Sequence, residues 1–151
     1  MWNKDRSVFL STVIVRAMYG VVALCCAMAP FIVRYYDDNI ILKTGAQSMF
    51  LPLLITLYCA VIPAVTALVS LDMLLRNIRR GKPFVRQNVK YLRILSYCCF
   101  AVSAVFIYFA TLRPFAFMIV IAGGFFGIIL RVVKNCFEQA AEMREENDLT
   151  I

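Results

Sequence analysis

Hydrophobic residues fall into four long runs along this chain, and short polar segments separate the runs. The runs cover about residues 8–33, 49–71, 94–112 and 115–133. Each is close to the ~20 residues that a helix needs to cross a lipid bilayer. A backbone inside lipid must satisfy its own hydrogen bonds, which favours helices. The pattern therefore predicts an all-α protein with four membrane-spanning helices.

Composition supports a membrane protein rather than a water-soluble one. Hydrophobic residues make up 62% of the 151 residues and charged residues 17%, whereas soluble domains average about 45–50% apolar and about 25% charged. A soluble domain of this size could not bury so much apolar surface. We therefore expect residues 1–151 to form a single integral membrane domain, arranged as a four-helix bundle.

The distribution of Lys and Arg predicts how the chain is oriented. The connection between the second and third runs, residues 72–93, holds seven basic residues and one acidic residue. The first connection balances Arg34 and Lys43 against Asp37 and Asp38. Because basic connections stay in the cytoplasm, we expect residues 72–93 and both termini to be cytoplasmic. The protein is then a multi-pass membrane protein.

The basic connection also has a helical pattern. Apolar residues from Leu71 to Ile78 recur at helical spacing, which extends the second helix beyond the membrane. Gly81 is a typical residue at a helix end, and Pro83 suits the first turn of a new helix. From Pro83 an apolar stripe and a basic stripe alternate. This indicates an amphipathic elbow helix at the membrane surface, leading into the third span.

Two interpretations of this basic connection remain open. It is either an elbow that lies on lipid headgroups or a docking surface for a cytoplasmic protein. The residues that would make these contacts are Arg79, Arg80, Lys82, Phe84, Arg86, Asn88, Lys90 and Arg93.

Two segments resemble a known family. They are Gly81-Lys82-Pro83-Phe84 followed by Asn88 and Leu92-Arg93-Ile94, and the ending ENDLTI, residues 146–151. The chain resembles an uncharacterised family of small bacterial four-span membrane proteins, a domain of unknown function with a G-x-P-F…N…L-R-I motif and an acidic D-L-T-I tail. Members are commonly encoded beside a short helix-turn-helix regulator of the Cro/CI type. The resemblance implies such a regulator as a partner, and it implies no established activity.

The tail, residues 134–151, continues the fourth helix into the cytoplasm and becomes acidic. An acidic tail next to a basic connection predicts electrostatic docking, within one subunit or between subunits. The alternative is a solvated helix end, because acidic residues at a helix C-terminus oppose the macrodipole and favour fraying. The candidate docking residues are Glu145, Glu146, Asp148 and Ile151.

Arg16 is the charged residue inside an apolar run, where a charge is costly. Three interpretations are open. Its long side chain extends to the headgroups, or it pairs with Asp72 at similar depth on the second span, or it serves a ligand or ion. Asp72 also has a local candidate partner in Arg76, four residues on.

Gly123 and Gly127 form a G-x-x-x-G pair in the fourth run, and this spacing lets two helices pack closely. The neighbouring helix is either another span of this chain or a second subunit. No cofactor or metal is expected, because the chain has no His and its six Cys are not spaced as a thiolate site.

Three functions compete. The first is a non-enzymatic regulatory or scaffolding protein that engages a cytoplasmic partner, with the small helix-turn-helix regulator as a candidate, or that self-assembles as a homo-oligomer. The second is a small transporter or channel. The third is a membrane enzyme that uses the external pair Asp37 and Asp38, although the segment 34–39 is more typical of a capped, solvated turn. Direct binding of nucleic acid is not expected.

Overall fold

The computed structural model describes residues 4–44 and 48–149 of the chain, and every element in these ranges is helical. The elements are α1 (Lys4–Thr44), α2 (Phe50–Arg79), α3 (Arg86–Leu112), the short 3₁₀ helix η1 (Pro114–Ala116) and α4 (Phe117–Leu149). Helices α1 to α4 are each long and apolar enough to cross a membrane. The prediction of an all-α protein with four such helices is confirmed.

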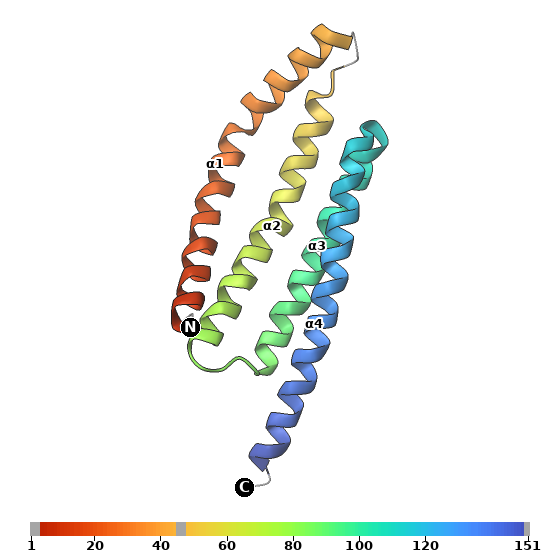
Figure 1. The fold of residues 1–151 in the computed structure, drawn as a ribbon. Helices are drawn as coiled ribbons and strands as arrows, with labels where there is room; N and C mark the ends of the chain where they lie inside the picture. Colours follow the sequence, from red (N-terminus) through yellow and green to blue (C-terminus); the bar gives the residue numbers. More distant parts are fainter. Residues whose placement is uncertain (1–3, 45–47, 150–151) are drawn as a thin grey trace.

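The helices form an open row rather than a closed bundle. Close backbone contacts within the described residues join α1 to α2, α2 to α3 and α3 to α4, and none joins α1 to α4. Figure 1 shows α1 and α4 at opposite edges of the row. The expected four-helix bundle is wrong in this respect. In lipid no hydrophobic force drives the helices together into a ring, so the outer faces can remain in contact with acyl chains.

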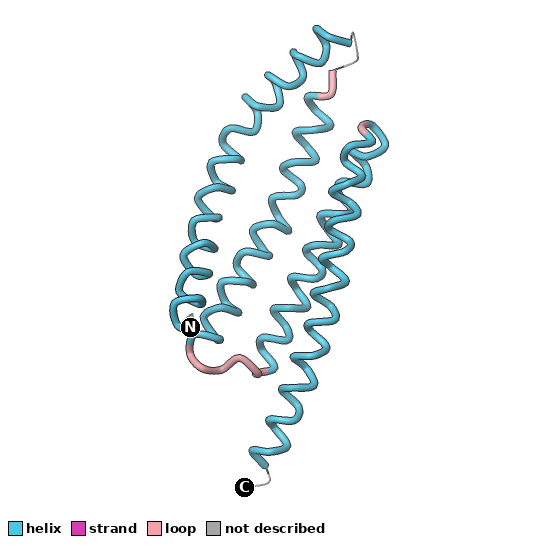
Figure 2. Tube along the Cα trace, viewed as in Figure 1, coloured by secondary structure: helices cyan, strands magenta, loops and turns pink. Residues whose placement is uncertain are grey.

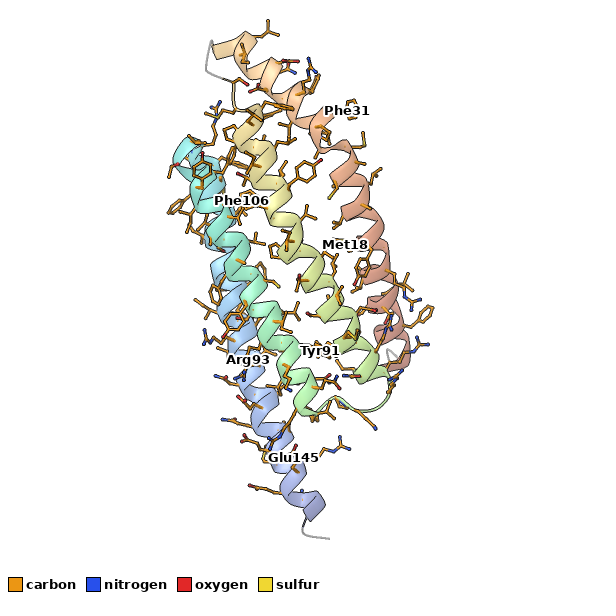
Figure 3. All side chains as sticks on the ribbon, turned by 180° about the vertical axis from the view of Figure 1, so that it is seen from behind. Met18, Phe31, Tyr91, Arg93, Phe106 and Glu145 are labelled. Carbon is orange, nitrogen blue, oxygen red and sulfur yellow. The ribbon has the colours of Figure 1, made fainter. Side chains whose placement is uncertain are left out.

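Burial is concentrated at the end of the molecule that carries both termini (Figure 1). Leu74 of α2 and Leu92 and Leu95 of α3 form a buried cluster there. Side chains of α4, including Val133 and Phe137, pack against this cluster. Apolar side chains elsewhere are largely exposed, as Phe31 on α1 is at 75% (Figure 3). Such residues are suited to contact with lipid.

Helix α1 is longer than the first apolar run. It continues through residues 34–39 to Thr44, so the expected turn in this segment is wrong. Asp37, although on α1, is 8% exposed because its carboxylate reaches the start of α2. The backbone N–H of Met49 donates to Asp37 Oδ1 at 2.7 Å, and the hydroxyl of Ser48 donates to Oδ2 at 2.5 Å. A carboxylate placed at a helix N-terminus stabilises that helix.

The end of α2 follows the sequence prediction. Gly81 has a φ of 72°, a left-handed conformation that favours glycine. The N–H of Gly81 donates to the carbonyl of Ile78 and that of Lys82 to the carbonyl of Asn77. These two hydrogen bonds form the Schellman motif, which closes a helix C-terminus. The predicted stop at Gly81 is confirmed.

A separate elbow helix is not present in the connection between α2 and α3. Residues 86–93 form the first two turns of α3 itself, and Val85 before them is extended. The side chain of Asn88 bonds the carbonyl groups of Lys82 and Pro83, which holds residues 82–85 outside the helix. Figure 2 shows this connection as a loop at the end that carries both termini.

Helix α4 projects beyond the other helices at that same end (Figure 1). Its part after the predicted span, residues 134–149, is about 24 Å long at 1.5 Å per residue. If residues 115–133 cross the bilayer, residues 134–149 extend beyond the membrane surface. The assignment of this end to the cytoplasm stays a prediction.

Candidate functional site

The connection between α2 and α3 is organised around Asn88. Its side chain is fully buried, at 0% exposure. The amide nitrogen donates to the carbonyl groups of Pro83 at 2.7 Å and Lys82 at 3.1 Å, and the amide oxygen accepts from Asn77 Nδ2 at 2.7 Å. Buried amides require such partners. Asn88 therefore joins the end of α2 to the start of α3, and it is unavailable for the partner or lipid contact expected of it.

Phe84 ties the same connection to α4. Its ring centroid lies 5.5 Å from that of Phe137 on α4, at an interplanar angle of 49°. The side chain is still 41% exposed. The connection consequently packs against the projecting part of α4 and is held on two sides.

An ion pair links the start of α3 to the tail of α4. Arg86 donates to both carboxylate oxygens of Glu145, from Nε at 2.9 Å and from an Nη atom at 2.7 Å. The hydrogen bond from Arg86 lowers the pKa of the Glu145 carboxyl below its ordinary value. The pair is exposed to solvent, so salt screens it. Its geometry matches the tail docking within one subunit that the charge pattern predicts as one alternative.

A second set of ion pairs lies two helical turns closer to the membrane. Glu138 of α4 accepts from Lys134 at 2.6 Å and lies 3.7 Å from Arg93 of α3. Arg86 and Arg93 lie seven residues apart on α3, and Glu138 and Glu145 lie seven residues apart on α4. The two helices run in opposite directions, so Arg86 faces Glu145 and Arg93 faces Glu138. Antiparallel helices bring such pairs into register. We call these four residues the ion-pair ladder (Figure 3 labels Arg93 and Glu145).

A cleft of about 140 Å³ lies between the two rungs of the ladder, and the small apolar residues Val89 and Ala141 are among the residues that line it. Val89 of α3 is 6% exposed and Ala141 of α4 is 2% exposed. Val89 and Ala141 are therefore buried between the helices, whereas the ion pairs beside them are exposed. The pairing of Arg86 with Glu145 was not recognisable from sequence, because the two residues lie 59 positions apart.

The other basic residues of the connection are not part of the ladder. Arg79 lies over the ring of Phe9, with its guanidinium carbon 5.7 Å from the ring centroid. Arg80, Lys82 and Lys90 are exposed, and none forms an ion pair within residues 4–44 and 48–149. These three cations form what we call the free basic surface.

The remaining tail candidates divide into two groups. Glu146 is exposed on the last turns of α4. The structure does not describe the side chain of Asp148, and Ile151 lies outside the described residues, so their docking stays a prediction.

Arg16 and Asp72 are not paired in the structure. Asp72 is 8% exposed and binds Arg76 of its own helix at 2.7 Å. Arg16 is exposed on α1, as extension toward the headgroups requires. The Asp72–Arg76 pair was the local alternative in the sequence, and it is formed because both residues lie on one face of α2 at i and i+4.

Gly123 and Gly127 lie against α3 of the same chain. A Cβ at Gly127 would come within 2.9 Å of the Phe100 ring, and one at Gly123 would collide with the Ser103 hydroxyl. Ser96 donates to the carbonyl of Gly127 at 2.8 Å, and Ser103 donates to that of Val120 at 3.1 Å. The two serines were missed in the sequence, where serine spacing alone gives little signal.

The proposed enzymatic pair does not converge. Asp37 and Asp38 are consecutive residues of α1 and therefore point about 100° apart. Both carboxylate oxygens of Asp37 already accept hydrogen bonds at the start of α2. Within the part of the chain that the structure describes, no group of His, Cys, Asp and Glu is arranged to hold a metal ion.

A cavity of about 310 Å³ lies between α1 and α2. Its walls are apolar side chains such as Val22, Ala29 and Val61, together with Tyr58, whose hydroxyl donates to the carbonyl of Cys26 at 3.2 Å. None of the described residues that line it is charged. The cavity suits hydrocarbon and offers no path for an ion, so it does not favour the transporter or channel alternative.

Comparison with known proteins assigns the chain to a family. Residues 41–151 match the family described as "Protein of unknown function (DUF2975)", and the chain belongs to it. The chain is also 24% identical to the "Uncharacterized membrane protein YoaS" of Bacillus subtilis (strain 168), over 99% of both chains. No solved structure matches it. Together with the four membrane-length helices, this makes it a multi-pass protein of the bacterial cell membrane.

Proposed function

We propose that this DUF2975 protein is a non-enzymatic membrane adaptor whose cytoplasmic end engages a cytoplasmic protein. The observation that carries the proposal is the ion-pair ladder, which joins the start of α3 to the projecting part of α4. A helix that only spans the membrane has no need of a further ~24 Å. A helix held against its neighbour by matched charges and by Val89 and Ala141 is suited to present a defined surface.

The basic residues at this end that form no ion pair within the described structure indicate the charge expected on the partner. Arg80, Lys82 and Lys90 are not used by the ladder. Lys90 lines a cleft together with the ladder residues Arg86, Arg93 and Glu138, and Arg80 and Lys82 lie on the connection between α2 and α3. An acidic surface on the partner complements them and speeds its association. The small helix-turn-helix regulator implied by the family resemblance is the first candidate, and self-assembly as a homo-oligomer is the second.

The test separates the ladder from the free basic surface. One variant carries Arg80→Gln, Lys82→Gln and Lys90→Gln, which removes three charges and leaves the ladder intact. A second carries Arg86→Gln and Arg93→Gln, which breaks the ladder. The matched control is Arg34→Gln, at the opposite end of the molecule. The tagged protein is purified in mild detergent with the candidate regulator co-expressed.

We expect both the triple variant and the ladder variant to lose binding of the regulator. High salt should weaken binding of the regulator to the parent in the same way as the triple variant does, because salt screens charges at the surface. Truncation after Arg144 should act like the ladder variant because it removes Glu145. Equal capture of the regulator by the parent and by all variants would contradict the adaptor function. Capture of a second copy alone, lost in the same variants, would replace the adaptor with self-assembly.

A further inference from the structure

A polar cleft of about 160 Å³ lies between α3 and α4. Arg93, Ser96 and Tyr97 line it from α3, and Arg131 and Lys134 line it from α4. Figure 3 shows Arg93 on α3 next to α4. Three cations from two helices therefore surround one small volume, although like charges repel each other when nothing lies between them.

The positive charge of the cleft is only partly neutralised. Glu138 binds Lys134 at 2.6 Å and lies 3.7 Å from Arg93. Arg131 is exposed, and it forms no ion pair among the residues that the structure describes. One carboxylate thus faces three cations, so the cleft keeps a net positive charge that favours an anion.

The donors in the cleft match a phosphate group. Arg93 and Arg131 offer planar guanidinium groups, which bind phosphate oxygens through paired hydrogen bonds. Tyr97 is 55% exposed and has a hydroxyl that can donate. Ser96 is buried and gives its own proton to the carbonyl of Gly127, so its side chain holds α3 and α4 together at the base of the cleft.

The depth of the cleft places it at the membrane surface. Arg93 immediately precedes the predicted span 94–112, and Arg131 and Lys134 lie at the end of the predicted span 115–133. Ile128 and Gly124 lie one and two turns from Arg131 toward the membrane centre, on the same side of α4. Ile128 is 59% exposed, and a methyl group on Gly124 would meet no atom within 4 Å. Open apolar surface therefore continues from the cleft into the bilayer.

We propose that this cleft binds the phosphate headgroup of one anionic phospholipid of the cytoplasmic leaflet. The headgroup occupies the space between Arg93, Arg131 and Lys134, and an acyl chain follows α4 past Ile128 and Gly124. The site differs from the general attraction of a basic connection to anionic lipid, because it is a discrete position built by two helices. It shares Arg93 with the ion-pair ladder, but it does not require the adaptor function.

The experiment is a native mass spectrometry titration of the full-length protein in detergent. The probes are dioleoyl-phosphatidylglycerol, the zwitterionic dioleoyl-phosphatidylcholine and inorganic phosphate. The variants are Arg131→Gln, which disturbs no ion pair of the described structure, and Tyr97→Phe, which removes only a hydroxyl. Arg144→Gln is the matched control, since Arg144 is an exposed cation of α4 outside the cleft.

We expect the parent to bind one phosphatidylglycerol in preference to phosphatidylcholine. Arg131→Gln should weaken that binding about tenfold, as loss of a charge-assisted hydrogen bond does, and Tyr97→Phe should weaken it by less. Arg144→Gln should leave it unchanged. Circular dichroism checks that each variant is folded, and if Arg131→Gln fails to fold, Tyr97→Phe decides.

Three results would overturn the proposal. Equal losses in Arg131→Gln and Arg144→Gln would mean that only total charge matters. Equal binding of the two lipids by the parent would remove the selectivity for an anion. Displacement of phosphatidylglycerol by millimolar inorganic phosphate would make the cleft a site for the free anion, not for a lipid.

Discussion

Gly123 offers a sharp test of how α4 packs on α3, because Gly124 beside it provides a matched control. A Cβ on Gly123 would collide with the hydroxyl of Ser103 and lie 3.2 Å from the carbonyl oxygen of Cys99. A Cβ on Gly124 would meet no atom within 4 Å. Both substitutions by Ala add the same methyl group to the same turn of α4, so they differ only in what the methyl group meets.

The magnitudes follow from this difference. Ala in place of Gly favours a helix by up to ~1 kcal/mol, so Gly124→Ala should be neutral or stabilising. Gly123→Ala has the same gain in helix propensity, but overpacking costs about 1–3 kcal/mol. We therefore expect Gly123→Ala to be about 1–3 kcal/mol less stable than Gly124→Ala, with a net loss of about 0–2 kcal/mol against the parent in the free energy of unfolding. Part of the cost arises because Ser103 must rotate away from the carbonyl of Val120, to which it donates at 3.1 Å.

The assay is unfolding by sodium dodecyl sulfate in mixed micelles, followed by circular dichroism, with size-exclusion chromatography to check the oligomeric size. The double variant Gly123→Ala with Ser103→Ala removes the hydroxyl that collides, so it should recover most of the loss. Equal stabilities of the Gly123→Ala and Gly124→Ala variants would refute the packing argument. A double variant no more stable than Gly123→Ala alone would show that Ser103 is not the obstacle.

Three further predictions concern topology and charge. A reporter fused to the C-terminus should be cytoplasmic and one inserted in residues 45–47 should be external; the opposite result would invert the assignment from the basic connection. A double-mutant cycle of Arg16→Leu and Asp72→Asn should give a coupling energy near zero, and a clear coupling in unfolding experiments would restore the pair. The depressed pKa of Glu145 means that its pair with Arg86 stabilises the tail above the ordinary pKa of 4.5 and is lost as the pH falls through the lowered value. Proteolysis of the tail should therefore accelerate at acid pH, and Glu145→Gln should reduce this acceleration while Glu138, whose pKa is also lowered by the hydrogen bond from Lys134, still titrates.

The number of membrane-length helices could be predicted from the sequence, because lipid imposes a strong constraint. A backbone in hydrocarbon has few alternatives to a helix, so the four apolar runs predicted α1 to α4. The stop at Gly81 was equally readable, since few residues other than glycine adopt its positive φ. These are local properties, and local patterns carry them.

The boundaries outside the membrane were less predictable. Residues 34–39 looked like a turn, yet α1 continues through them and sends Asp37 to the start of α2. The elbow helix expected from Pro83 became the start of α3 at Arg86. In water both helix and loop satisfy the backbone, so contacts with other elements decide, and Asn88 makes such contacts with Asn77, Lys82 and Pro83.

Pairings between distant residues were decided only by the tertiary structure. Charge alone suggested that basic connection and acidic tail would meet, but the sequence left open whether this happens within a subunit, and it did not single out Arg86 for Glu145. It likewise left open which helix packs against Gly123, and it wrongly predicted that the row of helices closes into a bundle. Each of these depends on the rotation of one helix against another. That rotation is set by the summed fit of many side chains along both helices, which the pattern of any single helix does not contain.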